Sequence, residues 1–377
     1  MKRILFCLFL LFLICGISAN DGSYYIDGNQ LIPIVEADIS VKKEILEIKR
    51  SKTNDRQVEV LVYYEFYNSG NPKTILVGFE ARSPYGDTDS SPKDGEHPNM
   101  YHFTIDMNGN KLPYQVDIVN DSLYFQDGKF KSLSSKEIKE NTGEGWADFM
   151  YVYHFQANFK KGLNIIKHTY TCDLSGSVMA TYEFGYILSA AMRWGNKQID
   201  DFTLHIDMGT DQLINIPQTF FNNTDEWTIA GTGRKQDTGN PYFFSDTDSN
   251  EPPTTSQFFI KNGYLIFQKK NFKPKGELFI YSPLGYTDLD NFNYLNMPYI
   301  DHNIMYSRYY EEDKVEDEIS KKVLRNLPFA KRGYIFSTPE LQKYFESQIW
   351  YFPDSTYKSD TSKLPQEEQK WVRYWSQ

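Results

Sequence analysis

The chain has 377 residues, a formal net charge of −10, 28 tyrosines and 27 phenylalanines. The acidic balance argues against nucleic acids and anionic membranes as partners, because both attract basic surfaces. This length allows two or three domains with buried cores, and the abundance of aromatic residues favours β-strands.

Residues 1–19 have the three parts of a secretory signal peptide. Lys2 and Arg3 carry positive charge, residues 4–14 form an apolar run, and small residues precede a cleavage point after Ala19. The run is shorter than the roughly 20 residues of a membrane-spanning helix, and no later run in the sequence approaches that length. We therefore expect export to the periplasm or to the outside of the cell.

Cysteines are scarce in the exported chain. Cys7 and Cys15 lie within the signal peptide, so only Cys172 remains and no intrachain disulfide is expected. The fold must therefore rest on its buried core. A lipoprotein is less expected than a soluble product, because Ile14 rather than a small residue precedes Cys15.

Residues 20–160 and 161–305 are predicted to form two β-sandwich-like domains, so the fold class is mainly β. Both contain short alternating apolar and polar segments separated by turns, with no helical pattern between them, which is typical of sandwiches rather than doubly wound sheets. Asn108-Gly109 and Asn262-Gly263 predict two-residue hairpin turns. The predicted strands cover 57–67, 74–79, 100–107, 111–118, 152–159, 163–172, 182–189, 202–208, 256–260, 263–269 and 277–281.

Helices are predicted in two places. Ser134-Ser-Lys-Glu137 matches a capping box and predicts a short helix at 134–141. In 306–377, apolar residues such as Val315, Ile319 and Val323 recur every three or four positions, which predicts a small α-helical C-terminal domain.

Capping signals divide this C-terminal domain into shorter helices. Pro328 is expected to kink or restart the first helix, and Gly333 suits its left-handed C-terminal cap. Thr338 with Pro339 predicts the start of a second helix, and Pro365 opens a third. The balance of charge also changes here, because acidic residues are in excess only before about residue 313.

The segment from Leu324 to Gly333, Leu-Arg-Asn-Leu-Pro-Phe-Ala-Lys-Arg-Gly, resembles the YARHG domain, a small module of exported bacterial proteins with a Tyr-Ala-Arg-His-Gly signature. Arg325 and Asn326 match its Arg-Asn pair, and the alanine and glycine of the signature are identical. The resemblance implies no reaction, because that family has no assigned chemistry. Arg332 replaces the signature histidine, which removes the one group that would titrate near neutral pH.

Two interpretations of this module stay open. In the structural one, Ala330 and Gly333 allow close packing of helices. In the other, the module binds a ligand or partner through Arg325, Asn326, Lys331, Arg332, Trp350 and Tyr351.

The β-rich part is similar to a group of uncharacterised exported bacterial proteins. The shared elements are Ala19-Asn-Asp21, an Ile-Ser-x-x-x-Glu element at 39–44 and an element from Trp194 to Ile199. The similarity covers about residues 19–210 and implies a β-sandwich without a known activity.

Catalytic candidates are poor. Cys172 and His168 are the residue types of a thiol nucleophile and its base, but four residues along a strand would separate them by roughly 13 Å. The sequence contains no hydrolase elbow, zinc-protease, phosphate-loop or dinucleotide motif. We therefore expect a non-catalytic protein without a cofactor.

Metal sites have equally little support. No two histidines lie on a predicted helix at the spacing that would let both bind one zinc ion. His154 and His168, however, flank a predicted hairpin and could meet there. The acidic loops 87–91 and 246–250 begin like calcium loops but are incomplete, so solvated loops are the default interpretation.

A role with glycans stays open. The paired carboxylates of a glycoside hydrolase are placed by the fold and cannot be excluded from a sequence. Aromatic-rich β-sandwiches can also bind sugars by stacking. Trp146, Trp194 and Trp227 are the tryptophans to test for exposure, although core packing is the expected role of each.

The sequence as a whole predicts an exported, non-catalytic protein that binds a cell-envelope component or a protein partner. The β domains and the helical module would share that role. The alternatives are an enzyme acting on envelope glycan or peptide, and a structural or stress-related envelope protein whose β domains only position the module.

Overall fold

The computed structural model describes residues 27–29, 32–33, 38–86, 88–120, 124–143, 146–177, 180–241, 253–283 and 318–376. The predicted signal peptide, Asp87 and the acidic loop 246–250 lie outside these residues. The strands are β1 (Asp27–Asn29), β2 (Ile32–Pro33), β3 (Ser40–Arg50), β4 (Gln57–Asn68), β5 (Lys73–Arg82), β6 (Met100–Met107), β7 (Asn110–Leu112), β8 (Gln115–Val119), β9 (Phe125–Gln126), β10 (Lys129–Phe130), β11 (Thr142–Gly143), β12 (Trp146–Ala147), β13 (Met150–Phe159), β14 (Gly162–Asp173), β15 (Ala180–Ile187), β16 (Ile199–Asp207), β17 (Gln212–Pro217), β18 (Trp227–Pro241), β19 (Thr254–Phe272) and β20 (Leu278–Pro283). The helices are α1 (Ser135–Glu140), α3 (Glu318–Lys331), α4 (Pro339–Glu346) and α5 (Gln366–Tyr374), with 3-10 turns η1 (Ser189–Arg193), η2 (Thr224–Glu226) and η3 (Thr361–Lys363).

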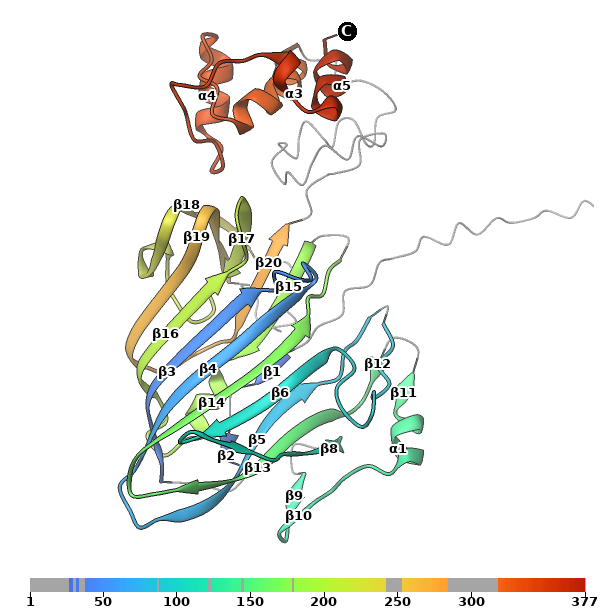
Figure 1. Ribbon diagram of the computed structural model, residues 1–377, viewed down its shortest axis with the longest axis vertical. Coiled ribbons are helices and arrows are strands. Elements are labelled where there is room, and N and C mark those ends of the chain that lie inside the picture. The colour runs from blue at the N-terminus through green and yellow to red at the C-terminus, as the bar shows by residue number, and fades with distance from the viewer. Residues whose placement is uncertain are drawn as a thin grey trace, which may run out of the picture.

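Most strands belong to one 16-stranded sheet that folds back on itself as two layers (Figure 1). Its order is β7-β6-β14-β4-β3-β16-β19-β17-β20-β15-β1-β5-β13-β8, with β18 beside β19 and β2 beside β5. The mainly β architecture with a small helical C-terminal region is therefore confirmed. No helix among the described residues is long and apolar enough to cross a membrane.

The strands of the two predicted β domains are interleaved in this sheet. β14 lies between β4 and β6, and β16 pairs in parallel with β3. Core side chains from both segments belong to one hydrophobic cluster. The structure thus differs from the predicted division at residue 160. Alternation of side chains indicates which segments are strands and which face is buried, but the choice of neighbour depends on long-range packing.

Strand β19 passes from one layer to the other at a glycine corner. Its C-terminal half pairs with β16 and its N-terminal half with β17, while β18 follows it along both halves. At the corner Gly263 lies opposite Gly231 and has a φ of +95°. The predicted hairpin turn at Asn262-Gly263 was wrong, because the glycine bends a continuous strand there. The turn at Asn108-Gly109 between β6 and β7 is confirmed.

The core is built largely from aromatic rings. Trp194 and Trp227 are each only 1% exposed, and the Trp194 ring lies 4.4 Å from that of Phe66. Their expected role in the core is confirmed. Trp146 differs, since it is 51% exposed and its indole lies over Gly143 of the neighbouring strand β11.

The helices α3, α4 and α5 pack together beyond the ends of β17, β18 and β19 (Figure 1). Leu213 and Phe259 of the sheet share a hydrophobic cluster with this module. Arg234 and Lys261 lie over the Phe352 ring, 4.8 Å and 5.2 Å from its centroid, and Arg234 donates a hydrogen bond to the Gln348 carbonyl. The module therefore contacts the β-sandwich through both apolar and cation–π interactions.

Several predicted helix ends are confirmed. Ser134 and Glu137 form the expected capping box of α1. Thr338 is the N-cap of α4 with Pro339 in its first turn, and α5 begins after Pro365. Pro328, expected to kink or restart the first helix, does not restart it, because α3 runs continuously through this residue.

Candidate ligand-binding site

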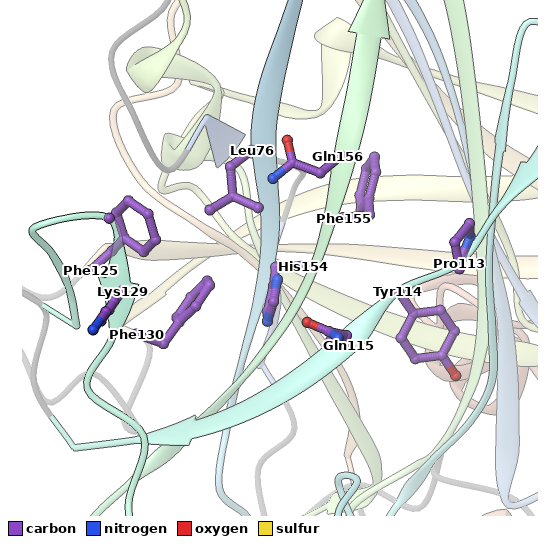
Figure 2. A pocket seen from close by; sticks show the side chains of 11 residues that line it. Leu76, Pro113, Tyr114, Gln115, Phe125, Lys129, Phe130, His154, Phe155 and Gln156 are labelled. Atoms are coloured by element: carbon purple, nitrogen blue, oxygen red, sulfur yellow. The ribbon is translucent and has the colours of Figure 1, made fainter.

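A pocket of about 470 Å³ lies on the outer face of the β5–β13–β8 part of the sheet, beneath the β9–β10 hairpin (Figure 2). In Figure 2, His154 occupies its centre, with Phe125, Lys129 and Phe130 on one side and Gln115 on the other. The full lining is Leu76, Pro113, Tyr114, Gln115, Phe125, Gly128, Lys129, Phe130, His154, Phe155 and Gln156.

Strand alternation explains the floor of the pocket. On β13, Tyr153 and Phe155 belong to the core cluster, whereas His154 and Gln156 lie on the opposite face. Gln115 of β8 pairs directly with His154. On the other side, β5 places Gly78 opposite His154, so no side chain fills that position. The result is a hollow bordered by two amide side chains.

The roof comes from the short β9–β10 hairpin. Asp127 and Gly128 both have positive φ, 51° and 75°, as a type I′ turn requires. The hairpin rests on the outer face of the sheet through a small cluster that includes Val152 and Phe130. Phe130 stacks on His154 with ring centroids 4.0 Å apart and an interplanar angle of 26°.

A carboxylate fixes the orientation of His154. His154 Nε2 lies 2.7 Å from Asp117 Oδ2, and the Ser132 hydroxyl donates to the other oxygen of Asp117. Since an ionised carboxylate can only accept, Nε2 carries a proton, and whenever the ring holds a single proton Nδ1 is an acceptor. Ser132 contacts the aspartate rather than the histidine, so these groups do not form a nucleophile–base pair.

The other sequence-derived candidates lie elsewhere. Cys172 and His168 are both fully buried on β14, where burial raises the pKa of the Cys172 thiol and lowers the pKa of His168 to about 3. Both effects keep the groups neutral, in agreement with an inert cysteine. His154 and His168 do not meet, because β13 pairs with β5 and β8 while β14 pairs with β4 and β6.

The described ranges contain no cluster of three or more His, Cys, Asp or Glu side chains able to hold a metal ion. In the described part of the 87–91 loop, Asp89 accepts from the Ser91 amide, and this hydrogen bond is the main cause that lowers its pKa. That arrangement is a local turn.

The six module residues named from the sequence fall into two groups. Trp350 and Tyr351 are buried, and Tyr351 donates a 2.8 Å hydrogen bond to the Tyr334 carbonyl. Arg332 pairs with Glu368 at 2.6 Å and donates to the Pro328 carbonyl. These side chains hold the module together. Asn326, half-buried, bonds back to the Lys322 carbonyl, whereas Lys331 is exposed and Arg325 half-exposed.

The signature glycine has a structural role. Gly333 follows α3 with a φ of +82°, and its amide donates to the Ala330 carbonyl. A Cβ at this position would lie 2.4 Å from the Phe352 carbonyl oxygen. The glycine therefore both caps the helix, as predicted, and allows the 352–354 segment to pack against it.

Pro328 leaves a backbone acceptor of α3 without its helical donor, since the Leu324 carbonyl would otherwise receive the amide of residue 328. The Trp371 indole of α5 donates to that carbonyl at 2.6 Å in a buried position. This bond explains how α3 continues through the proline.

Trp371→Phe is expected to lower the free energy of unfolding by about 1–3 kcal/mol, because it leaves the Leu324 carbonyl buried and unpaired. Urea denaturation followed by circular dichroism measures this loss. Adding Pro328→Ala restores a backbone donor, so the double variant should recover part of it. An equal loss with and without Pro328 would contradict this role of the indole.

Of the three elements shared with exported proteins, Ala19-Asn-Asp21 lies outside the described residues, and the other two, at 39–44 and from Trp194 to Ile199, meet in the structure. The Gly195 amide donates to the Ile39 carbonyl at 2.9 Å, and the Asn196 side chain bonds both the amide and the carbonyl of Val41. Glu44, at the end of the first element, is buried inside the sandwich. These contacts thus hold together the two chain segments at the point where the parallel pairing of β3 with β16 begins.

Of the residues that line the pocket, sequence reasoning singled out only His154, and it did so as a possible partner of His168. The Asp127-Gly128 pair is a hairpin signal that could have located β9 and β10. Nothing in the local sequence, however, marks Gln115 and Gln156 as neighbours, because they come together through pairing of β8 with β13.

Comparison with known proteins agrees with this architecture. Residues 304–377 match the YARHG domain. No functionally curated protein matches the chain in sequence. Among solved structures, a "putative nutrient binding protein" of Legionella pneumophila aligns with a TM-score of 0.53 and 17% identity, covering 94% of this chain and 98% of that one. It shows a shared fold.

Two further structures align more weakly. Baculovirus P35 has a TM-score of 0.26 and 11% identity over 67% of this chain and 99% of its own. A two-domain M1 zinc metallopeptidase has a TM-score of 0.21 and 8% identity over 63% and 44%. These scores are too low to indicate a shared fold.

Proposed function

We propose that this chain is an exported, non-catalytic binding protein that holds a small cell-envelope component in the pocket beneath the β9–β10 hairpin. The carrying observation is the pocket itself, whose volume of about 470 Å³ lies within the range of small-molecule sites. Its aromatic rings offer contact area, and its amides and imidazole offer hydrogen bonds that orient a ligand.

The chemistry of the lining supports binding rather than catalysis. The described residues around the pocket include no Ser, Thr, Cys, Asp or Glu. The hydroxyl or thiol nucleophile of a Ser, Thr or Cys enzyme and the paired carboxylates of a glycoside hydrolase are therefore both missing from this lining. Two acids outside the lining contact its residues: Asp117, whose oxygens are engaged by His154 and Ser132, and Glu96, which accepts from the Tyr114 hydroxyl.

Three further observations support the proposal. The Legionella pneumophila neighbour is named as a nutrient binding protein, which fits a binding role for the shared fold. The YARHG match and the predicted signal peptide favour export. In the module, the accessible cations Arg325 and Lys331 would offer a second contact to anionic envelope polymers or a protein partner.

Gln156→Trp tests the pocket, since an indole at this exposed floor position would fill the hollow without disturbing the core. The purified protein would be dialysed against a soluble digest of peptidoglycan sacculi and examined by native mass spectrometry. We expect a bound component in the wild type and none in Gln156→Trp. Asn158→Trp is the matched control, because Asn158 is the next exposed residue on the same face of β13 and does not line the pocket.

Two outcomes would contradict the proposal. One is absence of a bound component in the wild type, and the other is equal binding by Gln156→Trp. Thermal unfolding of each variant confirms that the comparison is made between folded proteins.

A further inference from the structure

The two glutamines at the pocket have free amides. Among the glutamines on the strands that the structure describes, Gln57, Gln212, Gln236, Gln257 and Gln268 all make side-chain hydrogen bonds to other side chains or to the backbone. Within the same described ranges no such bond involves the exposed hairpin residue Gln126, which lies outside the lining, or Gln115 and Gln156, which both line the pocket. Each offers two donors and an acceptor to a ligand.

The amides lie next to a preformed aromatic surface. Phe130 is held against His154, and the Phe125 ring meets Phe130 edge-on with centroids 5.1 Å apart. Both phenylalanines are half-buried and so keep part of their surface accessible. The sheet thus brings rings and neutral hydrogen-bonding groups into one hollow.

The charges around the hollow disfavour a zwitterion such as an amino acid. No carboxylate belongs to the described lining, and Lys129 is its one residue with a permanent charge. Lys129 is exposed on the hairpin, and its amino nitrogen lies on the side away from His154 (Figure 2). An amino acid would therefore find no partner for its ammonium group at the pocket floor.

A sugar ring has the properties that this arrangement requires. Its C–H face is apolar and flat enough to lie on an aromatic ring, and its rim carries neutral hydroxyls that both donate and accept. The amides and the His154 Nδ1 acceptor would meet that rim, while the rings would cover the face.

We propose that the pocket binds a neutral saccharide of one or two sugar units, stacked on Phe125 or Phe130 and hydrogen-bonded by Gln115 and Gln156. This inference rests on the proposed function and narrows its ligand class. The saccharide lies between the hairpin and the outer face of the sheet. Its hydroxyls form hydrogen bonds with the side-chain amides of Gln115 and Gln156.

Saturation-transfer difference NMR on the full-length protein tests this assignment. The probes are glucose, N-acetylglucosamine and their β-1,4-linked dimers, with leucine and glycine as amino-acid probes. We expect transfer to ring protons of at least one saccharide and none to the amino acids. In the double variant Gln115→Ala/Gln156→Ala, loss of two hydrogen bonds should weaken binding by about tenfold or more. Gln126→Ala is the control, since Gln126 is an exposed hairpin glutamine outside the lining.

The remaining outcomes separate this inference from the proposed function. Binding of an amino acid but of no saccharide would overturn the saccharide assignment and leave a binding pocket in place. Saccharide binding that persists in the double variant and in Gln156→Trp would overturn the assignment to this pocket. If no probe binds while the sacculus digest supplies a bound component, the ligand belongs to another class and the saccharide assignment fails.

Discussion

Gly263→Ala is expected to abolish stable folding of the β-sandwich, with a loss of about 4 kcal/mol or more in the free energy of unfolding. A Cβ on Gly263 would lie 1.9 Å from the Ala230 carbonyl oxygen and 2.9 Å from Gly231 Cα. Both are backbone atoms of the paired strand, so no side-chain rotation relieves the clash. Because domains are stable by only about 5–15 kcal/mol, we expect little folded protein in solution.

Gly109→Ala separates the effect of backbone conformation from that of close approach. Gly109 has a φ of +85°, close to that of Gly263, but a Cβ there would meet no atom within 4 Å. This variant should lose only about 1–2 kcal/mol from the strained dihedral angle. Urea denaturation followed by tryptophan fluorescence compares the two. Similar losses for both would mean that the strands do not approach as closely as the corner requires.

The corner illustrates what local sequence can and cannot predict. Asn108-Gly109 and Asn262-Gly263 are the same dipeptide between alternating segments, yet one is a hairpin turn and the other bends a single strand. The difference comes from the neighbouring strands, because β16 pairs with β19 after the corner, β17 pairs with it before the corner, and β18 follows it on both sides. The pairing with β16 and β17 involves residues at least 38 positions away and leaves no local signal.

Helix ends that depend only on neighbouring residues were predicted more completely than the pairing of strands. The Ser134–Glu137 capping box, the Gly333 cap and the Thr338 start of α4 each depend on side chains or φ angles within a few residues. Pro328 is the instructive exception. Its missing amide is a local fact, but the Trp371 indole that compensates for it comes from 43 residues downstream on another helix.

The candidate pocket is also a product of long-range pairing. The alternation of β13 predicts that His154 and Gln156 share a face, and Asp127-Gly128 predicts a hairpin. Only the pairing of β8 with β13 and the packing of Phe130 on His154 convert these features into a cavity. The apolar periodicity of the module predicted its helical fold but not which of its residues are accessible, since Trp350 and Tyr351 are buried.

Acid is expected to destabilise the protein steeply between pH 6.5 and 4, because two buried histidines stay neutral in the folded chain. Burial lowers the pKa of His168 to about 3 and that of His97 to about 4. Around His168 stand the rings of Tyr64, Phe79, Phe103 and Tyr170, and in the described part of the chain neither of its ring nitrogens has a hydrogen-bond partner.

The direction of this change in stability follows from the number of protons that the folded and unfolded chains bind. Above pH 6.5 both histidines are neutral in the folded and unfolded chains, so they add no pH dependence. As the pH falls towards 4, the unfolded chain binds two protons that the folded chain does not. At up to about 1.4 kcal/mol per pH unit for each group, the loss reaches about 6 kcal/mol by pH 4, where the folded chain begins to protonate His97. His168 alone extends the effect towards pH 3. Carboxylates with lowered pKa, such as Asp200 and Glu226, add to it only in the more acidic part of this range.

His168→Leu isolates one of the two contributions. Leucine is close to histidine in volume and has no nitrogen to desolvate, so stability at pH 7 should be equal or higher. At pH 4 the variant should be more stable than the wild type by about 3 kcal/mol, since one of the two protons no longer drives unfolding. His102→Asn, at an exposed position with a φ of +57° that asparagine tolerates, is the control and should leave the profile unchanged. Urea titrations at half-unit pH steps measure the slopes. If His168→Leu and the wild type lose stability in parallel, His168 takes up its proton without unfolding, and the aromatic surroundings of this residue would have to open to water below pH 6.5.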